Sequence, residues 1–252
     1  MHRLLLSVAA GLALAGSAAA QTYSLDSADG FELHNAVAES VTFQGKKAIR
    51  VKTSDEAAER IAAQRRAAAA RRKTSGGGRP GPGAGEANRV NHLIISPVKD
   101  FSSGTIEVDM AGQPGEGSSG GARGFVGVSF RLQPDNHTYD TFYLRPTNGR
   151  AEAQERRNHS AQYISHPDWP WFRLRSESPS KYESYVDIEP AKWIHVKIEV
   201  DGEKARLYVD GREQPTLIVN DLKSGPNGKG AVALWFEGST VAHFANLKIT
   251  KK

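Results

Sequence analysis

The sequence of 252 residues contains no cysteine. Disulfides, thiolate metal sites, cysteine nucleophiles and lipid attachment through an N-terminal cysteine are therefore excluded. Long hydrophobic runs are also lacking. The longest covers residues 4–16, whereas a membrane-spanning helix needs about 20 apolar residues, so no membrane span is predicted. The net charge of +5 is modest for this length and permits an anionic partner without requiring one.

The first twenty residues have the three parts of a secretory signal peptide. Arg3 gives a positively charged start, residues 4–16 are apolar, and Ala18 and Ala20 are small residues at the two cleavage positions. We expect cleavage after Ala20, which removes residues 1–20. A secreted chain without cysteine is typical of a bacterial periplasm or exterior, so a periplasmic or extracellular location is predicted.

Most of residues 23–52 and 89–252 alternates between apolar and polar side chains with a period of two, which is typical of half-buried strands. The clearest example is residues 192–210, where Asp201-Gly202 supplies a two-residue hairpin turn. Ten or more short strands without intervening helices predict an all-β fold of two packed antiparallel sheets.

Residues 53–88 are the exception to this pattern. Thr53 and Glu56 have the spacing of a helix capping box, and alanine dominates the turns that follow. Ile61 is the only large apolar side chain in this helix, so the helix has almost nothing to bury. A stretch rich in glycine and proline comes next. We therefore predict one β-sandwich domain over residues 21–252, interrupted by a helical surface insertion.

Arginine, amide and aromatic side chains are dense between residues 143 and 187. Residues 145–175 contain six arginines against three acidic residues. Guanidinium and amide groups bind hydroxyls or carboxylates, and indole rings cover the apolar face of a sugar ring. Nucleic acid uses similar groups, but the low net charge and the predicted secretion disfavour it as a partner. Carbohydrate is the predicted partner, and bracing of long loops by the arginines is the alternative interpretation.

Strand alternation assigns individual residues to this site. Arg131, Tyr143 and Arg145 share one strand face, opposite a face of apolar side chains. If the apolar face is the core, these three residues line an outer sheet face that the loop over 156–175 covers at one edge. The predicted ligand-binding residues are Arg131, Tyr143, Arg145, Arg157, Gln162 and Trp171.

The candidates for acid–base work are Glu183, Asp187 and His159. On a continuous strand the two carboxylates share a face and lie about 13 Å apart, which is too far to act as a pair on one glycosidic bond. The histidines that follow the signal form no i, i+4 pair on a helix, so no zinc motif and no metal-ligating set are predicted.

Several short strings carry a resemblance to the concanavalin A-like lectin/glucanase superfamily of jelly rolls, and more closely to secreted bacterial laminin-G-like proteins related to the 3-keto-disaccharide hydrolase family. They are GFVGVSFR at 124–131, FYLRP at 142–146, RRNHSAQY at 156–163, WFRLR at 171–175, YESYVD at 182–187, ARLYV at 205–209 and VNDLK at 219–223. The resemblance implies a jelly roll that binds or cleaves carbohydrate. Laminin-G-like modules often bind calcium, which leaves calcium open; no other cofactor is expected.

The laminarinase-type members of that superfamily carry Glu-x-Asp-x-x-Glu on one strand. The nearest match starts at Glu107, but Gly112 stands where the second glutamate is needed, so retaining hydrolysis on that motif is not expected. Three functions stay open. The first is a non-catalytic carbohydrate-binding protein, the second a glycoside hydrolase or polyuronate lyase, and the third an envelope interaction protein without a sugar ligand.

Overall fold

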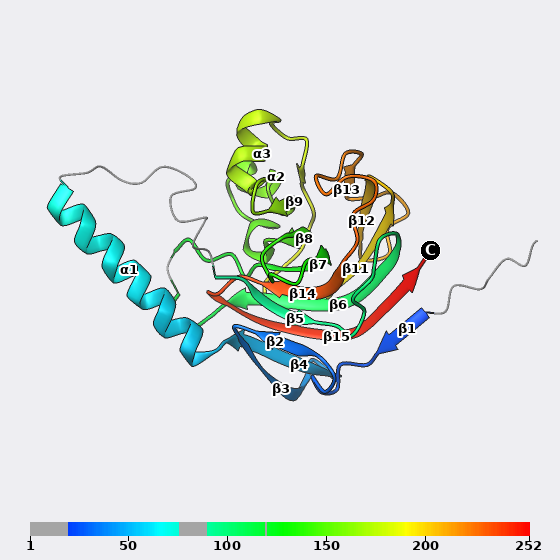
Figure 1. Cartoon of the computed structure of the whole chain (residues 1–252), viewed down its shortest axis with the longest axis horizontal. Helices are drawn as coiled ribbons and strands as arrows, with labels where there is room; N and C mark the ends of the chain where they lie inside the picture. The colour runs from blue at the N-terminus through cyan, green and yellow to red at the C-terminus, as the bar shows by residue number, and fades with distance from the viewer. Residues whose placement is uncertain (1–19, 76–89, 119) are drawn as a thin grey trace, which may run out of the picture.

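A computed structural model describes residues 20–75, 90–118 and 120–252 of the chain. Two antiparallel sheets pack face to face in a β-sandwich, and a long helix projects from one end (Figure 1). The predicted two-sheet jelly-roll fold is confirmed. The predicted signal peptide lies outside the described residues, apart from Ala20, which is the first residue of β1.

The first sheet, which we call sheet A, has the strand order β13–β12–β11–β6–β15–β4–β3, and β1 pairs with β15. Strands from before and after the insertion meet here, because β4 pairs with the C-terminal strand β15. The strands of sheet A are β1 Ala20–Tyr23, β3 Ala36–Phe43, β4 Lys46–Thr53, β6 Gly104–Pro114, β11 Ile194–Asp201, β12 Lys204–Val209, β13 Leu217–Val219 and β15 Thr240–Lys251.

The second sheet, sheet B, has the strand order β10–β9–β8–β7–β14–β5–β2. Its central strands β7 and β8 are buried along their whole length, so both faces of this part of the sheet are covered. The strands of sheet B are β2 Glu32–His34, β5 His92–Ile95, β7 Val126–Leu132, β8 Tyr139–Leu144, β9 Ala161–His166, β10 Glu183–Ser184 and β14 Ala231–Phe236.

The hairpin of β11 and β12 follows the predicted alternation. Ile194, Val196 and Ile198 are buried, and the residues between them are half-buried, because one face of this edge of sheet A meets the core and the other meets solvent. The turn lies one residue later than predicted. Asp201 pairs with Lys204, so the loop residues are Gly202 and Glu203. Gly202 has φ +58°, which glycine adopts without steric cost.

The outer face of sheet B is covered by the segment between β8 and β10 (Figure 1). This segment holds the 3₁₀ turn η2 Pro146–Asn148, the short helix α2 Gln154–Asn158 and the helix α3 Trp171–Glu177. It is the arginine-rich stretch of the sequence, which therefore lies directly over the sheet.

The predicted helical insertion is α1, Asp55–Ser75. Ser54, rather than Thr53, caps it: the Ser54 hydroxyl accepts the amide hydrogen of Ala57 at 3.3 Å, while Thr53 donates to the carbonyl of Gly238. Ala57 is buried, whereas residues 63–71 are exposed. The helix is therefore held to the sandwich by its first turns. The predicted glycine- and proline-rich stretch lies mainly outside the described residues.

Candidate functional site

Five side-chain positions form one row across the outer face of sheet B. Trp235 pairs with Gly127, Gly127 with Tyr143, Tyr143 with Gln162, and Gln162 with Glu183. Paired residues of neighbouring strands point their side chains to the same face. The row, which we call the central row, therefore brings residues from β14, β7, β8, β9 and β10 together on one surface.

A cleft of about 2110 Å³ opens over this surface. Residues of the helices α1, α2 and α3 contribute to its lining. The side chains that concern its chemistry are Phe125, Tyr143, Arg145, His159, Trp171, Arg175 and Trp235.

Several aromatic residues line the cleft. The ring centroids of Tyr143 and Trp235 are 5.1 Å apart, and those of Phe125 and Tyr143 are 5.9 Å apart. Tyr143 and Trp235 are buried, while Phe125 and Trp171 are half-buried. Because rings in mutual contact have little freedom to rotate, the buried Tyr143 and Trp235 hold Phe125 in place. Phe125 and Trp171 therefore supply the apolar ring surface that small-molecule sites use.

Arg145 is held rigidly beside these rings, with 6% of its surface exposed. Its Nη1 donates to the carbonyl oxygen of His159 at 2.7 Å, and its Nη2 donates to Tyr143 Oη and Gln162 Oε1, both at 2.9 Å. The guanidinium lies 5.0 Å from the Tyr143 ring centre. All three acceptors are uncharged, and burial lowers the pKa of Arg145.

Glu183 organises the other side of the cleft. Both of its carboxylate oxygens accept hydrogen bonds from Arg175, at 3.0 and 2.7 Å, and its Oε2 lies 2.8 Å from His159 Nδ1. Arg175 in turn lies 4.8 Å from the Trp171 ring centre. Burial lowers the pKa of His159, which the charge of Glu183 opposes. Glu183 therefore fixes the positions of the side chains that reach the cleft.

The structure brings most of the predicted site residues together. Tyr143, Arg145, His159 and Trp171 line the cleft, and Gln162 lies buried beneath Arg145. Arg157 is elsewhere on α2, where its Nη2 donates to Tyr185 Oη at 2.8 Å. Asp187 is also separate. It lies beyond the end of β10 and pairs with Arg150 at 2.8 Å on the exposed surface, so it does not share a strand face with Glu183.

Arg131 is not in the cleft, which corrects the predicted shared face with Tyr143 and Arg145. The pairing of β7 with β14 shifts register at this point, and Arg131 has φ +56°. Such a bulge turns a side chain out of the alternation. Arg131 is 1% exposed, and its guanidinium donates to the carbonyls of Ser102, Gly202 and Gly225 and to Ser224 Oγ. Arg131 therefore braces loops instead of lining the cleft.

The sequence analysis missed Trp235, Phe125 and Arg175 as lining residues. A signal for Trp235 is present: it alternates with Ala233 and Ala231 along β14, so a lone large ring stands among small side chains on its face. Phe125 and Arg175 gave no comparable signal, because Phe125 precedes β7 and Arg175 lies on a short helix.

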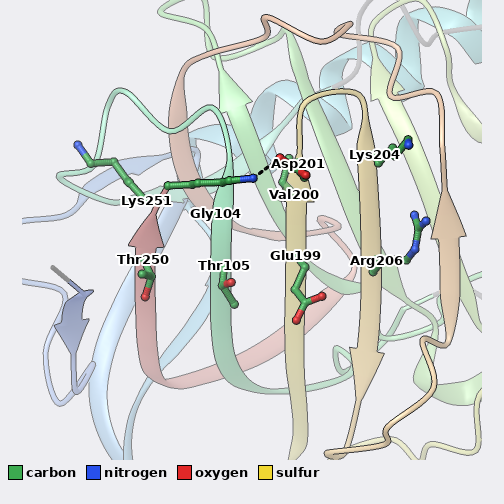
Figure 2. A pocket seen from close by; sticks show the side chains of 10 residues that line it. Gly104, Thr105, Glu199, Val200, Asp201, Lys204, Arg206, Thr250 and Lys251 are labelled. Atoms are coloured by element: carbon green, nitrogen blue, oxygen red, sulfur yellow. Dashed lines mark hydrogen bonds and ion pairs between the residues drawn. The ribbon is translucent and has the colours of Figure 1, made fainter. Parts of the chain in front are cut away.

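A second, smaller hollow of about 520 Å³ lies on the outer face of sheet A (Figure 2). Its charged side chains are mostly paired: Glu199 with Lys197 and Asp201 with Lys252, each at 2.8 Å. No aromatic side chain lines it. This hollow is therefore a surface of mutually neutralised charges, in contrast to the cleft on sheet B.

No group of three or more His, Asp or Glu side chains has the geometry to hold a metal ion in the part of the chain that the structure describes. No helix of the same residues is long and apolar enough to cross a membrane.

No family model and no curated protein matches the chain. Among solved structures, a protein of unknown function with a galectin-like fold from Bacillus subtilis is 11% identical, with a TM-score of 0.49 over 92% of this chain and 94% of that one. The carbohydrate-binding module CBM66 from Bacillus subtilis is 18% identical, with a TM-score of 0.44 over 64% and 82%. Domain 4 of a GH43 extracellular arabinanase from Geobacillus stearothermophilus, in complex with arabinotriose, is 11% identical, with a TM-score of 0.46 over 91% and 90%. At these identities and TM-scores the likenesses carry no conclusion about function.

Proposed function

We propose that the protein binds carbohydrate in the cleft on the outer face of sheet B. The observation that carries this proposal is the pair of half-buried rings in the cleft, Phe125 and Trp171, beside the rigid Arg145 guanidinium, which lies 5.8 Å from the Phe125 ring centre. Rings cover the apolar C–H face of a sugar, and a fixed guanidinium directs hydrogen bonds to its oxygens. Fixing both groups before binding lowers the entropy lost when a ligand is ordered.

The test is a glycan array followed by calorimetric titration of the best ligand. Trp171→Ala is expected to weaken binding by about tenfold to a hundredfold, because burying an aromatic side chain contributes about 1.5–3 kcal/mol. Because Trp171 is only half-buried, the melting temperature of the Trp171→Ala variant should stay close to that of the parent.

The matched control is Tyr208→Ala on the outer face of sheet A, where Tyr208 contacts Glu199 and Lys197. This variant should bind as the parent does. If Trp171→Ala also binds as the parent does, or if no glycan binds the parent, the proposed site is wrong.

A second candidate is turnover of the bound glycan. The observation in its favour is His159, which lines the cleft with Nδ1 held 2.8 Å from Glu183 and whose lowered pKa keeps a neutral imidazole at pH 7. A neutral imidazole accepts a proton in general base catalysis. Incubation with the bound glycan and chromatography of the products separates an enzyme from a binding protein, since a binding protein leaves the glycan intact.

Three further points belong to the proposal. We propose secretion to the periplasm or exterior on the pattern of residues 1–20, and amino-terminal sequencing of the protein recovered from its host tests it. We propose a relation to the 3-keto-disaccharide hydrolase family on the strings in the sequence. We also propose that binding needs no calcium, because the cleft is rich in arginine, which repels a divalent cation.

A further inference from the structure

Three guanidinium groups line the cleft without an ion pair to a described residue; Glu183, whose charge acts on Arg145, is itself bound by Arg175. Arg145 forms no ion pair with a described residue, although it is buried. Arg123 donates to the carbonyls of Gly120 and Ala122, and Arg156 donates to the Thr147 carbonyl and Asn148 Oδ1. Burial and the charges of Arg156 and Arg145 lower the pKa of Arg123, so these like charges act on one another.

Arg145 is the buried member of this group, whereas Arg123 is half-buried and Arg156 is exposed, so the lack of a counter-charge is most costly at Arg145. A buried charge normally has a partner of opposite sign. A guanidinium has five N–H donors, and Arg145 uses three of them in the hydrogen bonds to His159, Tyr143 and Gln162. It therefore retains two donors, one on Nε and one on Nη1, each of which suits a single anionic oxygen.

The lining of the cleft has a net positive charge. Eight lysine and arginine side chains line it against three glutamates. One of those glutamates, Glu237, is engaged by the backbone amide and hydroxyl of Ser239. On the side formed by α1, Arg65 and Arg66 are exposed and form no ion pair with a described residue. The positive charge therefore extends from the arginine cluster at the sheet to the helix that faces it.

We infer that the glycan bound in this cleft is an acidic polysaccharide. The arginine cluster of Arg123, Arg145 and Arg156 receives the anionic group of one sugar unit, and Arg65 and Arg66 on α1 receive the anionic groups of neighbouring units. This inference rests on the proposed function and names the class of its ligand. The anionic group is a carboxylate or a sulfate, both of which present paired oxygens to a guanidinium fork.

The test compares each acidic ligand with its own neutral form. Oligogalacturonate is titrated against its methyl ester, and a sulfated galactan oligomer against its desulfated form. For at least one of these two ligands, the acidic form should bind at least about tenfold more tightly than its neutral form. This is the gain expected from one charge-assisted hydrogen bond. The pair that responds identifies the anionic group. Raising the ionic strength from about 0.01 M to about 1 M should weaken the acidic form selectively.

Two double variants locate the effect. Arg123→Gln/Arg156→Gln removes two charges from the cluster and leaves the buried Arg145 in place. It should lose about tenfold in affinity for the acidic form and little for the neutral form. Arg65→Ala/Arg66→Ala removes exposed side chains from α1 and should weaken long acidic oligomers more than single units.

The matched control is Lys204→Ala/Arg212→Ala, which removes two exposed cations that do not line the cleft. Figure 2 shows Lys204 on the outer face of sheet A. The control changes the net charge by the same amount as each test variant and should bind as the parent does.

The outcomes separate this inference from the proposed function. If neutral forms bind as tightly as acidic ones, or if the control loses as much affinity as the cluster variant, the inference is overturned and glycan binding stands. If neither form of any glycan binds, the proposed function fails as well. A selective loss in the cluster variant, with the control unchanged, supports the inference.

Discussion

A single added methyl group at Gly127 should open the floor of the cleft. Gly127 lies in the central row between Tyr143 and Trp235, whose ring centroids are 5.1 Å apart. A Cβ at this position would lie 2.4 Å from the carbonyl oxygen of Phe142 and 2.7 Å from Tyr143 Cβ. Both distances are far inside van der Waals contact, so Gly127→Ala forces β8 or the Tyr143 side chain to move.

The expected cost has two parts. Overpacking a filled site costs about 1–3 kcal/mol, and separating an aromatic pair loses about 0.5–1.5 kcal/mol more. The free energy of unfolding should therefore fall by about 2–4 kcal/mol. For a domain of this size, each kcal/mol shifts the melting temperature by about 2–4 °C, so a decrease of roughly 5–15 °C is expected.

The assay is urea unfolding followed by tryptophan fluorescence, together with titration of the glycan that the parent binds. The control is Gly120→Ala, because an added Cβ at Gly120 meets no heavy atom within 4 Å. The control should match the parent in both measurements. If Gly127→Ala is as stable as Gly120→Ala and binds glycan equally well, the reasoning is refuted. The floor of the cleft would then not depend on the contact of Tyr143 and Trp235 across Gly127.

Three further predictions concern other parts of the molecule. Arg131→Met should lower the free energy of unfolding by about 3 kcal/mol or more, since buried carbonyls lose their donor, and should leave glycan affinity unchanged; reduced affinity in the folded variant would contradict its role as a brace. Burial lowers the pKa of His243 to about 4 from its ordinary 6.5, so the unfolded chain binds a proton between these values that the folded protein does not. Stability should therefore fall as the pH drops from about 6.5 towards 4, and urea unfolding of His243→Phe should show a smaller pH dependence; an unaltered dependence would exclude His243 as its source. Treatment with EDTA should leave glycan binding unchanged, and a loss that calcium restores would overturn the proposed independence of metal.

The fold was predictable where one face of a strand meets water. In β11 the alternation of Ile194, Val196 and Ile198 with polar residues identifies which face of the strand is buried. The helix α1 was equally clear, because alanine and a sequence of acids followed by arginines favour a helix whatever it packs against. These elements depend on local chemistry, which the sequence records.

The site was predictable only in part, because its geometry depends on contacts between distant segments. The alternation placed Tyr143 and Arg145 correctly. At Arg131 a bulge turns the side chain away from the cleft. No residue type in the sequence indicates a bulge at that position. The spacing of Glu183 and Asp187 assumed a continuous strand, whereas β10 ends at Ser184. Regular spacing is a reliable guide only as long as the strand continues.

The central row also determines when the binding surface forms during folding. Its positions come from β14, β7, β8, β9 and β10, and β14 follows the other four in the chain by way of strands of sheet A. Before β14 is made, Gly127 has Tyr143 of β8 on one side but lacks Trp235 on the other, so the floor of the cleft is incomplete. Such non-local pairing gives high contact order and slow folding. Ligand affinity should therefore appear in the last, global phase of refolding, and no fragment that lacks β14 should acquire it.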